Sequence, residues 1–494
     1  MGIVQRNSFK ITIVSYFGAV IGYLNKVFLF TNFLNLEQVG LANILITVAL
    51  LFAQFSALGT YNITLKFFPF FKNKQKGHNG FMFWALCLML IGFTITSLFA
   101  VLFKQTVVEY FSNKSQLFVD YYWYIIPLGL ATLVFTFFES YLRSLHKTVV
   151  PAFVNEVLLR LLIMASIVIY ALKVINFETF VVVYVIANIL PALIVLTYTA
   201  FLKELFLKPQ LSVIPKRLFK IMIVFGLFSF LNNVSSIIII TIDSLMVTGM
   251  IDLKATGIYT TMVFITSVLI MPYRSIIKVT APIVSELWKK KDLIGLEDLY
   301  KRVSASNLIV GGFIFILLWT NIDNILRLMP GNYEAGKYVF LFMGLGKLFD
   351  MATGLNGVIL GTSKKYRFDI IFTLLLVVLT ITNNYFLIPI WGINGAAIAS
   401  MITLFLYNIL RLLYVLYKFK IQPFKLKQLI VVALGLLVVL LNIQIEPLQN
   451  IFIDGVIRSA ICCIVFILPV FLLKISPDLN NMALNIKDRI FKRN

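Results

Sequence analysis

Long, uninterrupted runs of apolar residues recur along the whole chain and limit what it can fold into. Each run is about as long as the roughly 20 residues that a helix needs to cross a bilayer, and too long for the ~10-residue alternating segments of a membrane barrel. With 60% hydrophobic and 13% charged residues among 494, the chain keeps few residues for a soluble domain. We therefore expect an all-α polytopic membrane protein with about 14 transmembrane helices. The fourteen runs are centred near residues 21, 48, 92, 131, 161, 190, 230, 264, 311, 349, 379, 404, 435 and 462.

The positive charges are distributed unevenly between the connections. The chain has 43 Lys and Arg against 21 Asp and Glu, a net charge of +22. If the N-terminus is cytoplasmic, 33 of the 43 fall in the even-numbered connections and the two tails, 7 in the odd-numbered ones and 3 inside spans. Because cytoplasmic loops are enriched in Lys and Arg, we expect both termini to be cytoplasmic. The excess charge thus indicates membrane topology and no nucleic-acid partner.

Short internal repeats indicate that the chain is duplicated. FKITIV at 9–14 recurs as FKIMIV at 219–224, and NLEQVGL at 35–41 recurs as DLKATGI at 252–258. Six spans separate the copies, so the two halves have the same orientation, and duplicated halves are common in transporters. The repeats predict an N-lobe of spans one to six, a C-lobe of spans seven to twelve, and a third segment with spans thirteen and fourteen and a cytoplasmic tail. The predicted ranges are 1–208, 209–420 and 421–494.

Residues 283–303, in the predicted C-lobe, have the pattern of a basic amphipathic helix. Three consecutive lysines at 289–291 oppose apolar residues such as Leu296 and Tyr300. Such helices lie in the plane of a membrane interface. We expect this segment on the inner membrane surface, either attracting anionic head groups or serving as a solubilised linker.

Sequence motifs of catalysis and of metal binding are missing. Both histidines, His78 and His146, fall in predicted cytoplasmic connections, so the sequence offers no His-based triad and no HExxH motif. The GLGK stretch at 344–347 lacks the spacing of a phosphate-binding loop. We predict a transporter that is not an enzyme and has neither a cofactor nor a metal site.

Ionisable residues inside spans are costly unless they are paired or face water, so each is a candidate functional residue. Lys26 in span one has no acidic residue at helical spacing. Its partner is either an anionic ligand or Asp243 of span seven, which also lacks an opposite charge at helical spacing. Asn25 and Asn232 add hydrogen-bonding groups to the same two spans, where polar helix packing explains them equally well.

Three further pairs of ionisable residues stand at helical spacing. Glu156 and Arg160 in span five, and Lys347 and Asp350 in span ten, have opposite charges and can each form a structural ion pair. Arg274 and Lys278 in span eight have the same charge and no acidic neighbour. They either anchor the span at the cytoplasmic side or line a cationic entrance for an anionic substrate.

Three features of the chain are similar to those of a known family. They are the turns at 35–41 and 252–258, the two six-span halves and the stretch PYRSIIKVTAPIVSELWKKKD at 272–292. The chain resembles polysaccharide flippases of the multidrug/oligosaccharidyl-lipid/polysaccharide (MOP) exporter superfamily over essentially its whole length. The resemblance implies two pseudo-symmetric six-helix lobes around a central cavity, plus two extra C-terminal helices. It also implies transport of polyprenyl-diphosphate-linked oligosaccharide from the cytoplasmic to the outer leaflet by alternating access, for surface polysaccharide biosynthesis.

The family's cavity residues can be carried over only in part. Flippases of the peptidoglycan precursor have basic residues in spans one and eight, which correspond here to Lys26 and Arg274. They also have one in span two, which this chain lacks between Gly40 and Leu58, so the peptidoglycan precursor is a less favoured cargo. Candidate substrate-binding residues are therefore Lys26, Arg274, Lys278, Asn25 and Asn232, and candidates for ion coupling or gating are Asp243, Glu156, Arg160, Lys347 and Asp350.

Two other functions remain open from the sequence. The first is an ion-coupled multidrug exporter of the same superfamily, although the acid that such exporters often hold in span one is missing between Phe9 and Phe33. The second is a non-transporting membrane scaffold for polysaccharide synthesis. The flippase interpretation implies the bacterial cytoplasmic membrane as location. As partners it implies the lipid-linked oligosaccharide, membrane lipids and the polysaccharide polymerase machinery.

Overall fold

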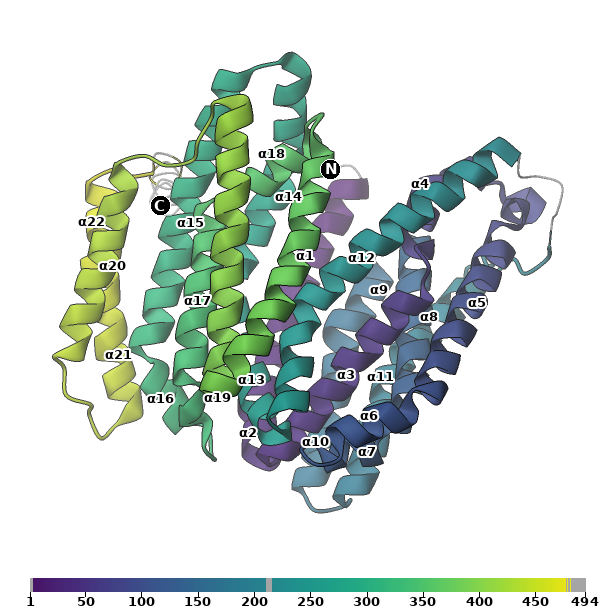
Figure 1. The fold of residues 1–494 in the computed structure, drawn as a ribbon, viewed down its shortest axis with the longest axis horizontal. Coiled ribbons are helices and arrows are strands. Elements are labelled where there is room, and N and C mark those ends of the chain that lie inside the picture. The colour runs from purple at the N-terminus through teal and green to yellow at the C-terminus, as the bar shows by residue number, and fades with distance from the viewer. Residues whose placement is uncertain (1–2, 210–215, 477, 479, 481–494) are drawn as a thin grey trace, which may run out of the picture. The chain divides into compact units, whose positions relative to one another are not determined.

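The structure of the protein, a computed structural model, describes residues 3–209, 216–476, 478 and 480. These residues form helices and connections and include no β-strand (Figure 1). They belong to two compact units, Met1–Thr260 (unit 1) and Thr261–Asn494 (unit 2). The boundaries of these units differ from those of the lobes 1–208 and 209–420 that the repeats predict. The two lobes therefore stay a prediction. The α-helices are α1 (Ile3–Tyr23), α2 (Phe30–Phe33), α3 (Leu36–Ser56), α4 (Thr60–Phe71), α5 (Phe81–Leu102), α6 (Lys104–Phe111), α7 (Gln116–Asp120), α8 (Ile125–Ser144), α9 (Val149–Phe153), α10 (Leu159–Ala171), α11 (Phe177–Phe201), α12 (Lys216–Met250), α13 (Leu253–Thr266), α14 (Ile270–Lys290), α15 (Leu293–Thr320), α16 (Ile322–Arg327), α17 (Lys337–Ala352), α18 (Asn356–Thr362), α19 (Tyr366–Phe419), α20 (Lys427–Ile443), α21 (Ile451–Cys462) and α22 (Leu468–Leu472).

The described part of the chain has eleven helices that are long and apolar enough to cross a membrane. The pair α17 and α18, which is bent by 51°, makes a twelfth if it is counted as one span. The all-α polytopic fold expected from the sequence is therefore confirmed, and the protein is a multi-pass membrane protein.

Helix α19 supplies two of the predicted spans because it folds back on itself. Its 54 residues would extend about 80 Å as a straight helix, far beyond a hydrocarbon core of about 30 Å. Gly392, with φ 56° and ψ −134°, interrupts the helix, and the Asn383 side chain donates a hydrogen bond to Thr403 across the turn at 3.0 Å. The two arms lie side by side in Figure 1. Counting them separately and adding the shorter apolar helix α20 gives the fourteen spans that the sequence predicts.

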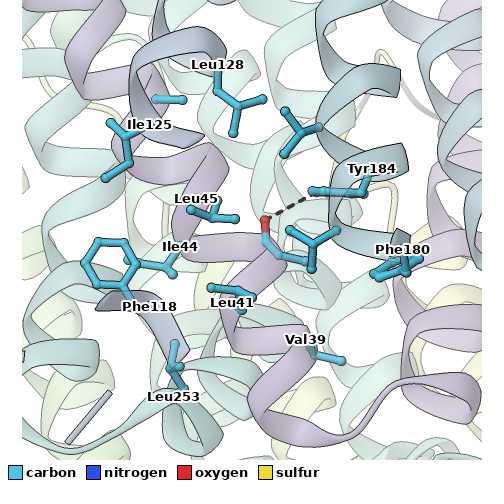
Figure 2. Packing of buried hydrophobic residues seen from close by; sticks show 14 of the residues in the cluster. Val39, Leu41, Ile44, Leu45, Phe118, Ile125, Leu128, Phe180, Tyr184 and Leu253 are labelled. Atoms are coloured by element: carbon cyan, nitrogen blue, oxygen red, sulfur yellow. Dashed lines mark hydrogen bonds between the residues drawn. The ribbon is translucent and has the colours of Figure 1, made fainter. Parts of the chain in front are cut away.

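The core of unit 1 is organised around α3 (Figure 2). Buried Ile44 and Leu45 of α3 belong to one cluster with Leu128 of α8 and Tyr184 of α11. The Tyr184 hydroxyl donates a hydrogen bond to the Ala42 carbonyl of α3 at 3.3 Å, shown dashed in Figure 2. Side-chain packing of this kind drives helix association in membranes. It holds α3, which carries a residue of the candidate site, in a fixed position within unit 1.

The predicted single amphipathic helix over 283–303 is wrong. The segment is divided between α14 and α15, because Lys291 adopts a left-handed conformation (φ 57°) that ends α14. Asp292 then caps α15 by accepting a hydrogen bond from the backbone N–H three residues further on, at 2.8 Å. Leu296 and Tyr300 are fully buried in a cluster of unit 2, so this face of the segment packs against protein.

Candidate functional site

Lys26 lies on a π-helical segment, η1 (Leu24–Leu29), between α1 and α2. A second π-helical segment, η4 (Val154–Leu158), lies in span five and contacts α1. π-Helical turns are rare and occur frequently at functional sites, because the extra residue redirects the side chains that follow. The two segments therefore mark the region around spans one and five as a candidate site.

Two glycines allow spans one and five to approach closely. A Cβ atom at Gly18 would overlap the backbone carbonyl of Glu156, and one at Gly22 would lie 3.1 Å from the Arg160 guanidinium. Small residues have this role at helix contacts in membranes. The close approach also lets the Asn25 side chain donate a hydrogen bond to the Arg160 carbonyl at 2.7 Å.

The Lys26 side chain has neutral partners in unit 1. Its ammonium donates a hydrogen bond to the Asn43 side-chain oxygen and lies 4.7 Å from the centre of the Phe30 ring. The ion pairs of the described residues do not include Lys26. Hydrogen bonding and cation–π contact lower the cost of the charge, but a neutral amide does not cancel it. Within the part of the chain that the structure describes, the positive charge of Lys26 thus has no carboxylate that compensates it.

Asn43 is in turn held by a residue two positions beyond the second copy of the predicted repeat. Its side-chain nitrogen donates a hydrogen bond to the Thr260 hydroxyl at 3.0 Å, across 217 residues. The sequence repeat at 35–41 and 252–258 has the same offset. Asn43 and Thr260 are therefore equivalent positions of the two copies.

Other contacts between α3 and α13 also join equivalent residues. Glu37 and Lys254 form an ion pair at 3.4 Å. A Cβ atom at Gly40 would overlap the Leu253 carbonyl, and one at Gly257 would overlap the Leu36 carbonyl. When each residue contacts its own counterpart, and the remaining contacts are reciprocal, the two segments are related by a local two-fold axis. The repeats found in the sequence thus pack against each other inside unit 1, next to Lys26.

Glu156 and Arg160 form an ion pair at 2.6 Å, the arrangement expected of opposite charges four residues apart in a helix. Both side chains are about 30% exposed. Nearby Asn25 is buried, and its side-chain oxygen accepts no hydrogen bond from the described residues. This region of span one therefore combines an uncompensated cation with an unused acceptor.

The two candidates on α12 have different surroundings. Asp243 is buried and accepts a hydrogen bond from the Tyr259 hydroxyl at 2.9 Å. Asn232 is exposed, and its backbone carbonyl accepts a hydrogen bond from Ser236 at 2.8 Å. Asn232 is thus accessible to a ligand, whereas Asp243 lies within the protein.

Arg274 and Lys278 lie on α14 of unit 2, separate from the unit that contains Lys26. Both side chains are exposed. Four residues apart on one helix face, they present two positive charges together. Unit 1 therefore contains the candidates Lys26, Asn25 and Asn232, and unit 2 contains Arg274 and Lys278.

Lys347 and Asp350 of α17 form hydrogen bonds with different helices. Lys347 is buried and donates to the Thr266 hydroxyl at 2.7 Å. The Asp350 carboxylate accepts from the Asn408 side chain at 2.9 Å. Each group is thus stabilised by a neutral partner of its own, which their spacing in the sequence does not predict.

An ion pair in unit 2 was missed by the sequence analysis. Arg411 and Asp369 pair across the two arms of α19, and the Arg411 guanidinium lies 4.1 Å from the centre of the Tyr407 ring. The residues are 42 positions apart, so no helical spacing connects them. The signal that could have found the pair is a turn near Gly392, which places both residues at the same ends of two antiparallel spans.

A polar cluster in unit 1 joins a connection to the end of α11. The buried His78 ring lies 2.7 Å from the Glu204 carboxylate and accepts a hydrogen bond from the Asn73 backbone at 3.1 Å. Lys74 pairs with the same carboxylate at 2.7 Å. Burial raises the pKa of Glu204, but the hydrogen bonds and charges of Lys74 and His78 lower it more, so the pKa lies below its ordinary value. The cluster fastens the connection to α11.

The fold of the chain is similar to that of several solved transporters. It resembles the lipid II flippase MurJ in an inward closed conformation, at 14% identity and a TM-score of 0.71, over 95% of this chain and 99% of that chain. It resembles an inward-facing multidrug resistance MATE transporter of the MOP superfamily at 15% identity and a TM-score of 0.62, over 81% and 94% of the two chains. A MOP superfamily transporter from Pyrococcus furiosus matches at 14% identity and a TM-score of 0.53, over 85% and 95%. The chain thus shares its fold with these transporters.

Comparison of the sequence with known families gives a narrower assignment. No curated protein matches the chain significantly. The model of the family described as polysaccharide biosynthesis protein matches residues 4–288, which is more than half of the 494 residues. The matched region includes Lys26 and Arg274, the two residues that the sequence analysis carried over from flippases. The chain therefore belongs to the polysaccharide biosynthesis protein family.

Proposed function

We propose that the protein is a flippase that moves polyprenyl-diphosphate-linked oligosaccharide from the cytoplasmic to the outer leaflet by alternating access. Membership of the polysaccharide biosynthesis protein family supports the biosynthetic role. The fold shared with MOP transporters supports the transport role. The observation that carries the proposal is the uncompensated charge of Lys26.

A sugar diphosphate needs a positively charged path through the membrane. Its head group carries about two negative charges and is excluded from hydrocarbon by the high cost of burying unpaired charge. A site that attracts it must present positive charge that no carboxylate has already neutralised. Lys26 meets this requirement, because its hydrogen-bond partner is the neutral amide of Asn43.

The geometry around Lys26 also favours reversible binding. An ammonium group has three hydrogen-bond donors, and Asn43 occupies one of them. The others remain for phosphate oxygens, so the ligand can bind without breaking an ion pair. One or a few such contacts bind weakly enough for release on the other side, as alternating access requires.

We further propose Asn25 and Asn232 of unit 1, with Arg274 and Lys278 of unit 2, as contacts of the head group. Asp243, Glu156, Arg160, Lys347 and Asp350 are the candidates for ion coupling or gating. The distribution of Lys and Arg favours cytoplasmic termini and, with the proposed cargo, the bacterial cytoplasmic membrane. The polysaccharide polymerase machinery is the proposed protein partner.

The proposal is tested in liposomes that contain the purified protein and a fluorescent lipid-diphosphate oligosaccharide in the inner leaflet. We expect the wild-type protein to accelerate appearance of the lipid outside, Lys26→Ala to abolish the acceleration, and Lys26→Arg to restore much of it. Lys104→Ala is the matched control, because the Lys104 ammonium also lies 4.7 Å from an aromatic ring, that of Trp123.

Two results would contradict the proposal. Normal transport by folded Lys26→Ala protein would remove Lys26 from the mechanism. No acceleration of any anionic lipid-linked sugar by folded wild-type protein would favour the multidrug exporter instead. An assay of cation efflux from the same liposomes would then decide that case.

A further inference from the structure

We propose that unit 2 binds an anionic phospholipid in a pocket beside α20, with its phosphate at Lys425 and an acyl chain among apolar side chains. This lipid is a bound membrane component and is distinct from the transported cargo. The proposal therefore does not depend on flippase activity.

The pocket is a cavity of about 650 Å³, within the roughly 300–1,000 Å³ typical of small-molecule sites. It lies between α20 and the helices α15, α17 and the second arm of α19. Figure 1 shows α20 alongside α15 within unit 2, and the two helices are in contact. Most of its wall is aliphatic or aromatic, including Leu308, Leu348, Phe405, Leu429 and Val432.

The amide side chains in the wall are already engaged. Gln428 donates to the Ser304 hydroxyl and accepts from the Lys425 backbone N–H, both at 3.0 Å. Gln422 exchanges two hydrogen bonds with the Phe424 backbone, at 2.9 and 2.8 Å. With these groups engaged, the wall is suited to hydrocarbon and not to a sugar.

Positive charge is concentrated at the connection between α19 and α20, which forms part of the pocket wall. Lys425 is the charged residue of the lining, and it is exposed. The surrounding stretch 418–427 contains four lysines and no acidic residue. Lysines next to a membrane attract anionic lipids by about 1 kcal/mol each. The charge distribution predicts this connection on the cytoplasmic side, where lysine-lined pockets between spans bind lipid phosphates.

Together these features fit an amphiphile with one phosphate and an acyl chain. A single lysine in the lining matches the one negative charge of a phosphodiester better than the charge of a diphosphate. A second pocket, in unit 1, shows the contrast. It measures about 470 Å³, is lined by α4, α5 and α12, and has no charged residue in its lining. That pocket offers nothing to distinguish head groups.

The test uses the full-length protein, purified and delipidated in detergent, with lipid binding measured by native mass spectrometry. Phosphatidylglycerol is compared with phosphatidylcholine of identical acyl chains. We expect tighter binding of phosphatidylglycerol and a loss of about fivefold with Lys425→Ala. Lys418→Ala, which removes an exposed lysine of the same stretch outside the pocket, should weaken binding less than Lys425→Ala does. Val432→Trp, which fills the pocket from α20, should weaken binding of both lipids.

Three outcomes would overturn the proposal. The first is equal binding of the two lipids by the wild-type protein, a comparison that remains valid if a variant fails to fold. The second is an equal loss with Lys425→Ala and Lys418→Ala. The third is stronger binding of a polyprenyl phosphate than of phosphatidylglycerol that Lys425→Ala removes, because the pocket would then belong to the cargo. Lys26→Ala should leave phosphatidylglycerol binding unchanged, which separates this test from that of the flippase.

Discussion

Lys26 in unit 1 and Arg411 in unit 2 both place a positive charge among apolar helices, but their partners differ. Arg411 pairs with the Asp369 carboxylate across a helical hairpin. Lys26 has the neutral Asn43 amide and the Phe30 ring. An ion pair of this kind holds the fold together, because removing one partner leaves the other as an isolated charge. An uncompensated charge is available to a ligand. The comparison therefore separates a structural cation from the one that we propose as functional.

The largest expected effect comes from breaking the compensated pair. Arg411→Ala should destabilise the protein by about 2–3 kcal/mol, somewhat below the usual range for buried pairs because the two side chains are 12% and 24% exposed. Thermal unfolding in detergent measures the change. The double variant Arg411→Leu with Asp369→Leu should recover much of the loss, because no charge is left isolated.

A surface pair provides the control for this experiment. Arg143 and Glu139 are paired at 3.2 Å with side chains that are 54% and 33% exposed. Arg143→Ala should cost only about 0–1 kcal/mol. If Arg411→Ala costs no more than Arg143→Ala, the hairpin pair is not structural and the contrast with Lys26 fails.

The next largest effect is expected from substitutions of two glycines, one near each of the two charged groups. In unit 1, a Cβ atom at Gly257 would overlap the Leu36 carbonyl, at the crossing that positions Asn43. In unit 2, a Cβ atom at Gly357 would lie 2.7 Å from the flexible end of Arg411. Gly257→Ala should therefore destabilise by about 1–3 kcal/mol. Gly357→Ala should be near neutral because alanine favours the helix. Equal melting temperatures of the two variants would contradict this difference.

Asn43→Asp would give Lys26 a carboxylate partner, as Arg411 has in Asp369. The new carboxylate would compensate Lys26, so we expect unchanged or higher thermal stability and transport reduced at least tenfold. Opposite charges at hydrogen-bond distance attract by about 4 kcal/mol near a protein surface, and a loss of about 1.4 kcal/mol in ligand binding already corresponds to tenfold. Asn43→Ala should retain transport, since it leaves the charge free. The reverse result would assign the role to the Asn43 amide and not to the free charge.

Apolar runs located the spans because span length and composition are local properties of the sequence. The repeat at 35–41 and 252–258 predicted equivalent positions, and the structure brings them into contact. The partners of charged residues were not predictable in the same way. Lys26 bonds to Asn43 from another span, and Arg411 meets Asp369 only because α19 folds back at Gly392. Tertiary packing, which no local spacing encodes, decides which charges are compensated.

The smallest expected effect is a pH dependence outside the spans of unit 1. Glu204 has a pKa below its ordinary value in the folded state. The carboxylate therefore stabilises the folded state fully at pH values above the ordinary pKa, and this stabilisation is lost as the pH falls through the lower, folded value. The effect is small because Lys74 is 56% exposed and water screens its charge.

Thermal unfolding of the wild-type protein and of Glu204→Gln between neutral and acidic pH measures this contribution. The variant should be less stable than the wild type at neutral pH, and the two should converge as the pH falls. Glu37→Gln is the matched control, because Glu37 and Lys254 are paired at 3.4 Å with both side chains well exposed, so its loss should be smaller. A stability difference for Glu204→Gln that is constant with pH would show that the charge of Glu204 contributes nothing. The pair of Glu204 with the exposed Lys74 would then not be structural, and only pairs with both partners as deeply placed as Arg411 and Asp369 would count as compensated.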